Sequence, residues 1–110
     1  MAAEQLALYA LGEFQTRGKT LAGRELPLDR LRGALRRAAE ACAAEELSDD
    51  AAAAAFAAIG AQVRRVPLFV AKHPYRVSVP SNVAERALEF YREALARQRG
   101  EKLAAGKTSN

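Results

Sequence analysis

One stretch of the chain cannot be helical, and this limits the folds that the sequence can adopt. Residues 66–82 read VPLFVAKHPYRVSVPSN, with a proline near each end, whereas the rest of the chain carries Ala, Leu, Arg and Glu at helical spacing. A proline inside a helix removes a backbone hydrogen bond and clashes with the preceding turn, so Pro67 must end one helix and Pro80 must precede the next. The sequence therefore predicts helices on both sides of a non-helical element.

The residues between these prolines have the pattern of strands. In residues 75–79, YRVSV, apolar and polar side chains alternate with the period of a half-buried strand. Residues 68–71, LFVA, form an apolar run that is typical of a strand covered on both faces. We predict one short β-hairpin or extended element at about residues 67–79. It must pack on the helices or pair with another chain, because a two-stranded hairpin is marginally stable alone.

The expected turn of this hairpin has an unusual sequence. His73-Pro74 offers no Gly or Asn for a tight primed turn, and a proline at the second central position would have to be cis. We therefore expect a longer loop, with Pro74 at the first central position of a type I turn. Such a loop presents His73 at a surface tip between Lys72 and Arg76.

Hydrophobic periodicity predicts four helices around this element. A connector with two glycines and a proline, residues 16–27, separates the first helix from the second. The fold class is thus mainly α, a small four-helix domain over residues 1–100, followed by a frayed or disordered basic tail at 101–110. The predicted helices cover about residues 4–15, 28–47, 48–66 and 80–100.

Composition indicates that the single domain has a thin core. Half of the 110 residues are hydrophobic, but many of these are alanines, which bury little area, and there is no Trp. Association with a second copy or with a partner subunit can supply the missing burial. A homo-oligomer or a protein partner is therefore expected.

The cysteine count and the N-terminal sequence bear on the compartment. A single cysteine, Cys42, excludes an internal disulfide and indicates a reducing compartment. The first residues, MAAEQLALYALGEF, lack the positive charge and the long apolar run of a signal peptide, and no segment reaches the length of a membrane span. We expect a cytoplasmic protein with no membrane partner.

The charges come in blocks along the chain. Residues 16–37 hold seven basic and two acidic side chains, a net of +5, whereas residues 38–50 hold five acids and no base. Residues 64–80 hold four basic side chains and no acid. Two alternatives follow. The acidic block pairs with a basic block of the same chain or of a second copy, or the basic blocks bind a separate anionic partner.

Neither a nucleotide site nor a catalytic site is evident in the sequence. GEFQTRGKT at 12–20 and GEKLAAGKT at 100–108 have five residues between the first Gly and GKT, whereas a phosphate loop needs four and should follow a strand. His73 is the only histidine, no nucleophile lies near it, and it cannot form a metal site alone. We expect no enzyme, cofactor, metal or small-molecule substrate, unless a site forms between subunits near His73 and Tyr75.

These observations favour a non-catalytic small subunit or adaptor that contacts an anionic partner, most plausibly nucleic acid, through basic surfaces. Few Asn or Gln side chains accompany the arginines, so phosphate contacts with little sequence preference are expected. The alternative is a purely structural protein–protein interaction module that does not bind nucleic acid. His73, Tyr75 and Phe90 are the candidate partner interface. The candidate phosphate contacts are Arg64, Arg65, Lys72 and Arg76, then Arg30, Arg32, Arg36 and Arg37.

Overall fold

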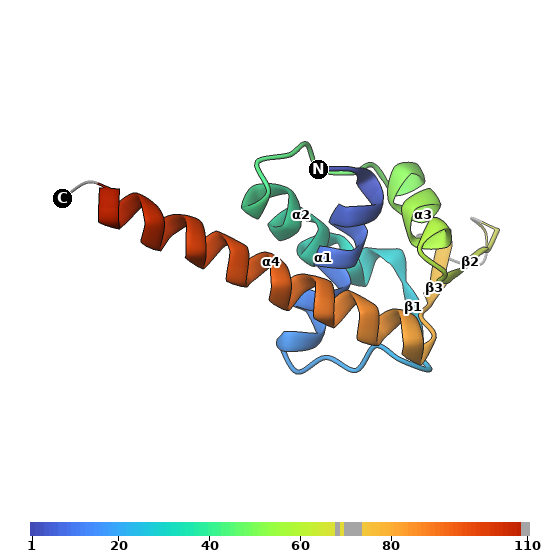
Figure 1. Cartoon of the computed structure of the whole chain (residues 1–110). Helices are drawn as coiled ribbons and strands as arrows, with labels where there is room; N and C mark the ends of the chain where they lie inside the picture. The colour runs from blue at the N-terminus through green and yellow to red at the C-terminus, as the bar shows by residue number, and fades with distance from the viewer. Residues whose placement is uncertain (68, 70–73, 109–110) are drawn as a thin grey trace.

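The computed structural model describes residues 1–67, 69 and 74–108, with side chains described as far as Gly100. The predicted fold class is confirmed, because the domain is mainly helical and carries a β-hairpin between its third and fourth helices (Figure 1). The elements in chain order are α1 (Ala3–Thr16), β1 (Glu25–Pro27), the 3-10 helix η1 (Leu28–Leu31), α2 (Arg32–Ala41), α3 (Asp49–Ala58), β2 (Gln62–Arg65), β3 (Tyr75–Ser78) and α4 (Ser81–Thr108).

Helix α1 is the centre of the core, since it contacts α2, α3 and α4. All of its residues from Leu6 to Phe14 except Leu8 are buried. It packs tightly against α4 at Gly12, where a side chain would meet the backbone of Ala87. One turn earlier, the rings of Tyr9 and Tyr91 meet edge to face, with centroids 4.9 Å apart. Small residues therefore let α1 and α4 approach closely, and the aromatic pair fills the space beside them.

The three strands form one antiparallel sheet in the order β1-β3-β2. In the central row, Leu26 of β1 and Val63 of β2 flank Val77 of β3, which is buried. Strand β1 lies in the segment predicted to be a connector, and that prediction is wrong for residues 25–27. Three residues are too few to show an alternating pattern. This strand forms because it can hydrogen-bond to the edge of β3.

The hairpin begins earlier in the chain than predicted. Its first strand is β2, in residues that were assigned to the end of the third helix. Beyond β2, the N–H of Val66 donates to the carbonyl oxygen of Pro74 at 2.6 Å. The strand predicted at 68–71 lies outside the described residues except for Phe69, as does the turn at His73.

Two helices end earlier than predicted, at Ala58 instead of Val66 and at Ala41 instead of Leu47. Helix α3 ends because Gly60 adopts a φ of +106°, which glycine accepts readily. The N–H of Gly60 then bonds to Ala57 O and that of Ala61 to Phe56 O, the pattern of a Schellman cap. Helix α2 ends with the same pattern, although the residue with positive φ is Ala43.

The fourth helix continues beyond its predicted end at Gly100 and reaches Thr108. A helix of 28 residues is about 42 Å long at 1.5 Å per residue. Figure 1 shows its C-terminal part projecting beyond the rest of the domain. Fraying of residues 101–110 stays a prediction.

Candidate partner-binding surfaces

The arginines at the start of α2 are engaged within the chain. Arg32 forms an ion pair with Glu46, and its Nη1 lies 3.2 Å from Oδ1 of Asp49. Arg36 reaches the other oxygen of Glu46, with Nε 3.5 Å away. The acidic block at 38–50 thus pairs with the basic block of the same chain at these positions, which is one of the two alternatives that the sequence left open.

Arg37 is held by a buried carboxylate. The side chain of Glu13 is only 8% exposed, and its Oε2 accepts a hydrogen bond from Arg37 Nε at 2.8 Å. Its Oε1 pairs with Arg17, one turn further along α1. Arg30 is exposed and forms no ion pair with another described residue. Of the four arginines predicted to contact phosphates from the second helix, three are therefore bound to acids of their own chain.

The succession of α2 and α3 bears on one mode of DNA binding. In helix-turn-helix domains the second helix of such a pair enters the major groove and contacts base edges. The exposed positions of α3 carry Asp49, Asp50 and alanines. Carboxylates repel the phosphate backbone, and alanine offers no hydrogen bond to a base. Helix α3 is unsuited to reading DNA in this way.

The outer face of the sheet carries the polar side chains of its strands. Since Val77 points into the core, Arg76 points away from it, and Arg64 lies directly beside Arg76 in the register. The guanidinium of Arg64 donates from Nη2 and Nε to the two oxygens of Glu25, at 2.7 and 3.3 Å. This bidentate hydrogen bond, together with the charges of Arg64 and Arg76, lowers the pKa of the Glu25 carboxyl. The same bond raises the pKa of Arg64.

Tyr75 connects the hairpin to α3. Its hydroxyl donates to Oδ1 of Asp50, and this bond raises the pKa of the Tyr75 hydroxyl, because ionisation would set two negative charges side by side. The guanidinium of Arg65 lies over the Tyr75 ring, 5.5 Å from its centroid. Tyr75 is half-buried and packs against the core, so it contributes an internal contact, and its part in a partner interface stays a prediction.

The most exposed aromatic side chain among the described residues is Phe69, between β2 and β3, at 92%. Phe69 belongs to the apolar run LFVA, but that run was predicted to be a strand covered on both faces and not an exposed surface. Lys72 and His73, which were predicted at the tip of the same loop, lie outside the described residues. Phe90, predicted as part of the partner interface, is half-buried and packs against the core cluster.

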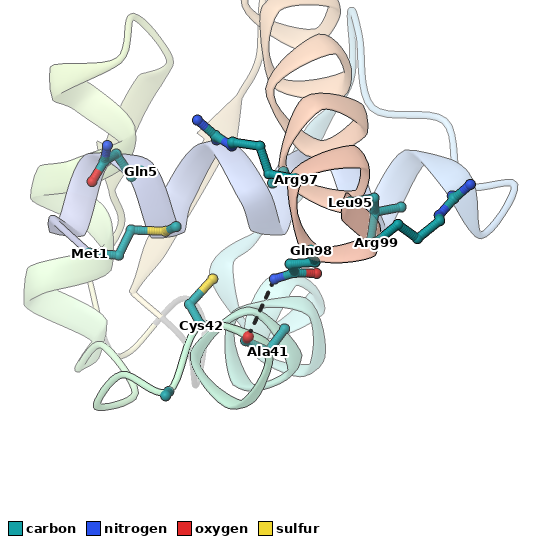
Figure 2. A pocket seen from close by; sticks show the side chains of 10 residues that line it. Met1, Gln5, Ala41, Cys42, Leu95, Arg97, Gln98 and Arg99 are labelled. Atoms are coloured by element: carbon teal, nitrogen blue, oxygen red, sulfur yellow. Dashed lines mark hydrogen bonds between the residues drawn. The ribbon is translucent and has the colours of Figure 1, made fainter. Parts of the chain in front are cut away.

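A second candidate surface is a groove where the start of α1, the end of α2 and the middle of α4 diverge. Its volume is about 960 Å³, and its walls are Met1, Gln5, residues 41–43, Ala94, Leu95 and residues 97–99. Figure 2 shows the Cys42 side chain pointing from the end of α2 toward α1, and Gln98 bonded to the carbonyl oxygen of Ala41 at 3.4 Å. Partial burial raises the pKa of the Cys42 thiol. The sequence could not have indicated this groove, because its walls come from three separate segments.

No cluster of three His, Cys, Asp or Glu side chains in the described part of the chain could hold a metal ion. Within the same residues, no helix is both long and apolar enough to cross a membrane. Comparison with known proteins found no matching family model, no similar curated protein and no similar solved structure. The functional argument therefore rests on the surfaces of this chain.

Proposed function

We propose that this domain is a non-catalytic adaptor that binds an acidic segment of a partner protein through the β2–β3 hairpin. The observation that carries the proposal is the 92% exposure of Phe69 between two strands that bear Arg64, Arg65 and Arg76. Aromatic residues and arginines are enriched at protein–protein interfaces, where a few of them supply most of the binding energy. An exposed aromatic side chain in the connection between two strands that carry cations suits a partner with both an apolar side chain and carboxylates.

The distribution of ion pairs favours an acidic protein over nucleic acid. Binding to nucleic acid depends on many phosphate contacts at once. Arg32, Arg36 and Arg37 already pair with acids of their own chain, and α3 presents Asp49 and Asp50. At the hairpin, Arg64 is also engaged, because it forms a bidentate hydrogen bond with Glu25. The hairpin therefore offers few phosphate contacts, whereas one exposed aromatic side chain and a few arginines are enough to bind a peptide segment.

Site-specific photocrosslinking in the cells that make the protein tests the proposal. A photoreactive phenylalanine analogue replaces Phe69, and in a matched control the same analogue replaces Ala54, an exposed residue of α3. We expect a discrete crosslinked protein from position 69 that is absent from position 54. The crosslink should disappear when Arg64→Glu and Arg65→Glu are added, because both cations are then reversed. Equal crosslinking from the two positions would refute the proposal.

The alternative partner is nucleic acid, and separate measurements detect its binding. The chain has three Tyr and no Trp, so any copurifying nucleic acid dominates its ultraviolet absorbance when nuclease is left out of the purification. Fluorescence anisotropy of a labelled oligonucleotide should show no binding at physiological salt. Oligonucleotide binding that weakens steeply with salt, and that is lost in the Arg64→Glu, Arg65→Glu variant, would show that the partner is nucleic acid and not a protein.

A further inference from the structure

Strand β2 lies at one edge of the sheet, and half of its residues turn their backbone polar groups outward. The sheet order β1-β3-β2 leaves β2 bonded on one side only (Figure 1). The N–H of Val66 donates to the carbonyl oxygen of Pro74, and in an antiparallel ladder such bonds occur at every second residue, so Arg64 is also bonded to β3. The N–H and C=O groups of Val63 and Arg65 therefore point away from β3.

These outward groups of Val63 and Arg65 have no partner within the described part of the chain. Neither residue forms a further backbone or side-chain hydrogen bond there. Arg65 is exposed and Val63 is half-buried. A row of unpaired N–H and C=O groups at a sheet edge is a template for pairing with another chain. The β2 edge thus offers donors and acceptors at alternate residues to an extended segment.

The opposite edge of the sheet, β1, is less suited to receive a strand. The backbone groups of Val77 face β1, so its register partner Leu26 is the residue of β1 that bonds to β3. Glu25 and Pro27 are then the residues that face outward, and Pro27 has no N–H to donate. Prolines commonly prevent pairing at sheet edges. Of the two edges, β2 is the one that can accept a further strand.

We infer, on the basis of the proposed function, that the edge of β2 receives the acidic segment of the partner as a fourth, antiparallel strand. The segment exchanges backbone hydrogen bonds with Val63 and Arg65, and its residue between these two lies directly opposite Arg64. Antiparallel pairing is slightly more stable per residue than parallel pairing. In this direction the preceding residues of the segment run past Val66 toward the connection that carries Phe69.

The charges of β2 select an acidic segment over a second copy of the chain. In a twofold pairing that bonds Val63 to Arg65 of the other copy, Arg64 lies directly opposite Arg64 of that copy, and like charges in this position are destabilising. An acid at the same position meets a cation with unused donors. Arg64 bonds to Glu25 from Nη2 and Nε, which leaves the N–H groups of Nη1 for a second carboxylate. Arg65 forms no ion pair with another described residue and adds a second cation.

Amide hydrogen exchange of the wild-type chain, followed residue by residue by NMR, tests this pairing. The probe is a synthetic peptide of sequence TVEEVT with blocked ends. In the free chain the amides of Val63 and Arg65 should exchange fast, whereas those of Arg64 and Val66, which bond to β3, should exchange slowly. At a peptide concentration about ten times its dissociation constant, exchange at Val63 and Arg65 should slow about tenfold, because only the unbound chain exchanges. The matched peptide TVKKVT should have no effect.

N-methylation of the peptide distinguishes strand addition from other binding of an acidic segment. Methyl groups on the amides of its first Glu and second Val, which face β2 in the proposed register, should abolish binding. Methyl groups on the amides of its second Glu and last Thr, which point away, should not. Binding of both methylated peptides would refute strand addition and leave the proposed function standing.

Two other results would also overturn the inference. Slow exchange at Val63 and Arg65 in the free chain would show that the edge is already paired. The same conclusion would follow if the unmodified peptide had no effect up to about 1 mM, a concentration that detects weak complexes. The proposed function is judged separately, by the crosslink from position 69, which does not depend on how the segment is bound.

Discussion

Gly12 of α1 lies against Tyr91 of α4 so closely that no side chain fits between them. A Cβ atom added to Gly12 would lie 2.5 Å from the carbonyl oxygen of Ala87 and closer still to Cβ of Tyr91. Contacts to backbone and to a Cβ atom cannot be relieved by rotating a flexible side chain. The glycine in α1, which weakens a helix in isolation, is thus a requirement of helix packing in this domain.

Replacing Gly12 by alanine should therefore destabilise the domain even though alanine is the better helix former. Forcing a methyl group into a packed contact costs about 1–3 kcal/mol, whereas the gain in helix propensity is about 1 kcal/mol. Urea denaturation monitored by circular dichroism measures the free energy of unfolding. Gly100→Ala is the matched control, because nothing lies within 4 Å of a Cβ there. It should leave stability unchanged or raise it, and a loss of stability in the control but not at Gly12 would contradict this account.

The two helix ends explain why part of the fold was predictable and part was not. Gly60 after α3 is a normal stop signal, since its positive φ suits glycine, yet Val63 and Val66 continue the helical spacing of Phe56 and Ile59. The apolar pattern alone therefore extended the helix over β2. At the end of α2 the same cap uses Ala43, a residue with no preference for positive φ. No local signal there indicated that the helix stops.

The candidate surfaces show the same division between local and non-local information. Alternation in YRVSV correctly placed β3, and the charge blocks correctly suggested acid–base pairing. The identity of the pairs depends on which segments meet in space. Arg64 was assigned to a helix end, but it lies in β2 and binds Glu25 of a strand that the sequence did not reveal. Likewise, the groove beside Cys42 exists only once three helices are packed.

Ala43 gives the second prediction, because its φ of 51° is unfavourable for any residue with a Cβ. Ala43→Gly removes this penalty and should raise the free energy of unfolding by about 0.5–1 kcal/mol. Ala57→Gly is the matched control, since Ala57 is exposed within α3 and has helical neighbours on both sides. There the same substitution should lower stability by about 1 kcal/mol. Thermal or urea denaturation of both variants at equal concentration tests whether the two substitutions change stability in opposite directions. A loss of stability at both positions would show that α2 does not end in this cap.

The third prediction concerns the ionisation of Glu25 on the outer face of the sheet. The hydrogen bonds from Arg64 are the largest cause of its lowered pKa, and the charge of Arg76 acts in the same direction. Arg64→Ala should therefore raise the pKa of Glu25 toward the value of an ordinary glutamate, and Arg76→Ala should raise it less. Side-chain carboxyl shifts in a 13C NMR titration report this pKa directly.

The lowered pKa of Glu25 also predicts the direction in which the stability of the fold changes with pH. A carboxyl whose pKa is lower in the folded state stabilises the fold above its unfolded pKa, and this contribution is lost as the pH falls through the folded pKa. The loss should begin below the ordinary glutamate value of about 4.3, and it should be smaller in Arg64→Ala, because little of the pKa difference remains. Urea denaturation of both chains between neutral and acidic pH measures it. Since both side chains are exposed, we expect a small effect. A Glu25 pKa that stays low in Arg64→Ala would show that Arg64 is not its main cause.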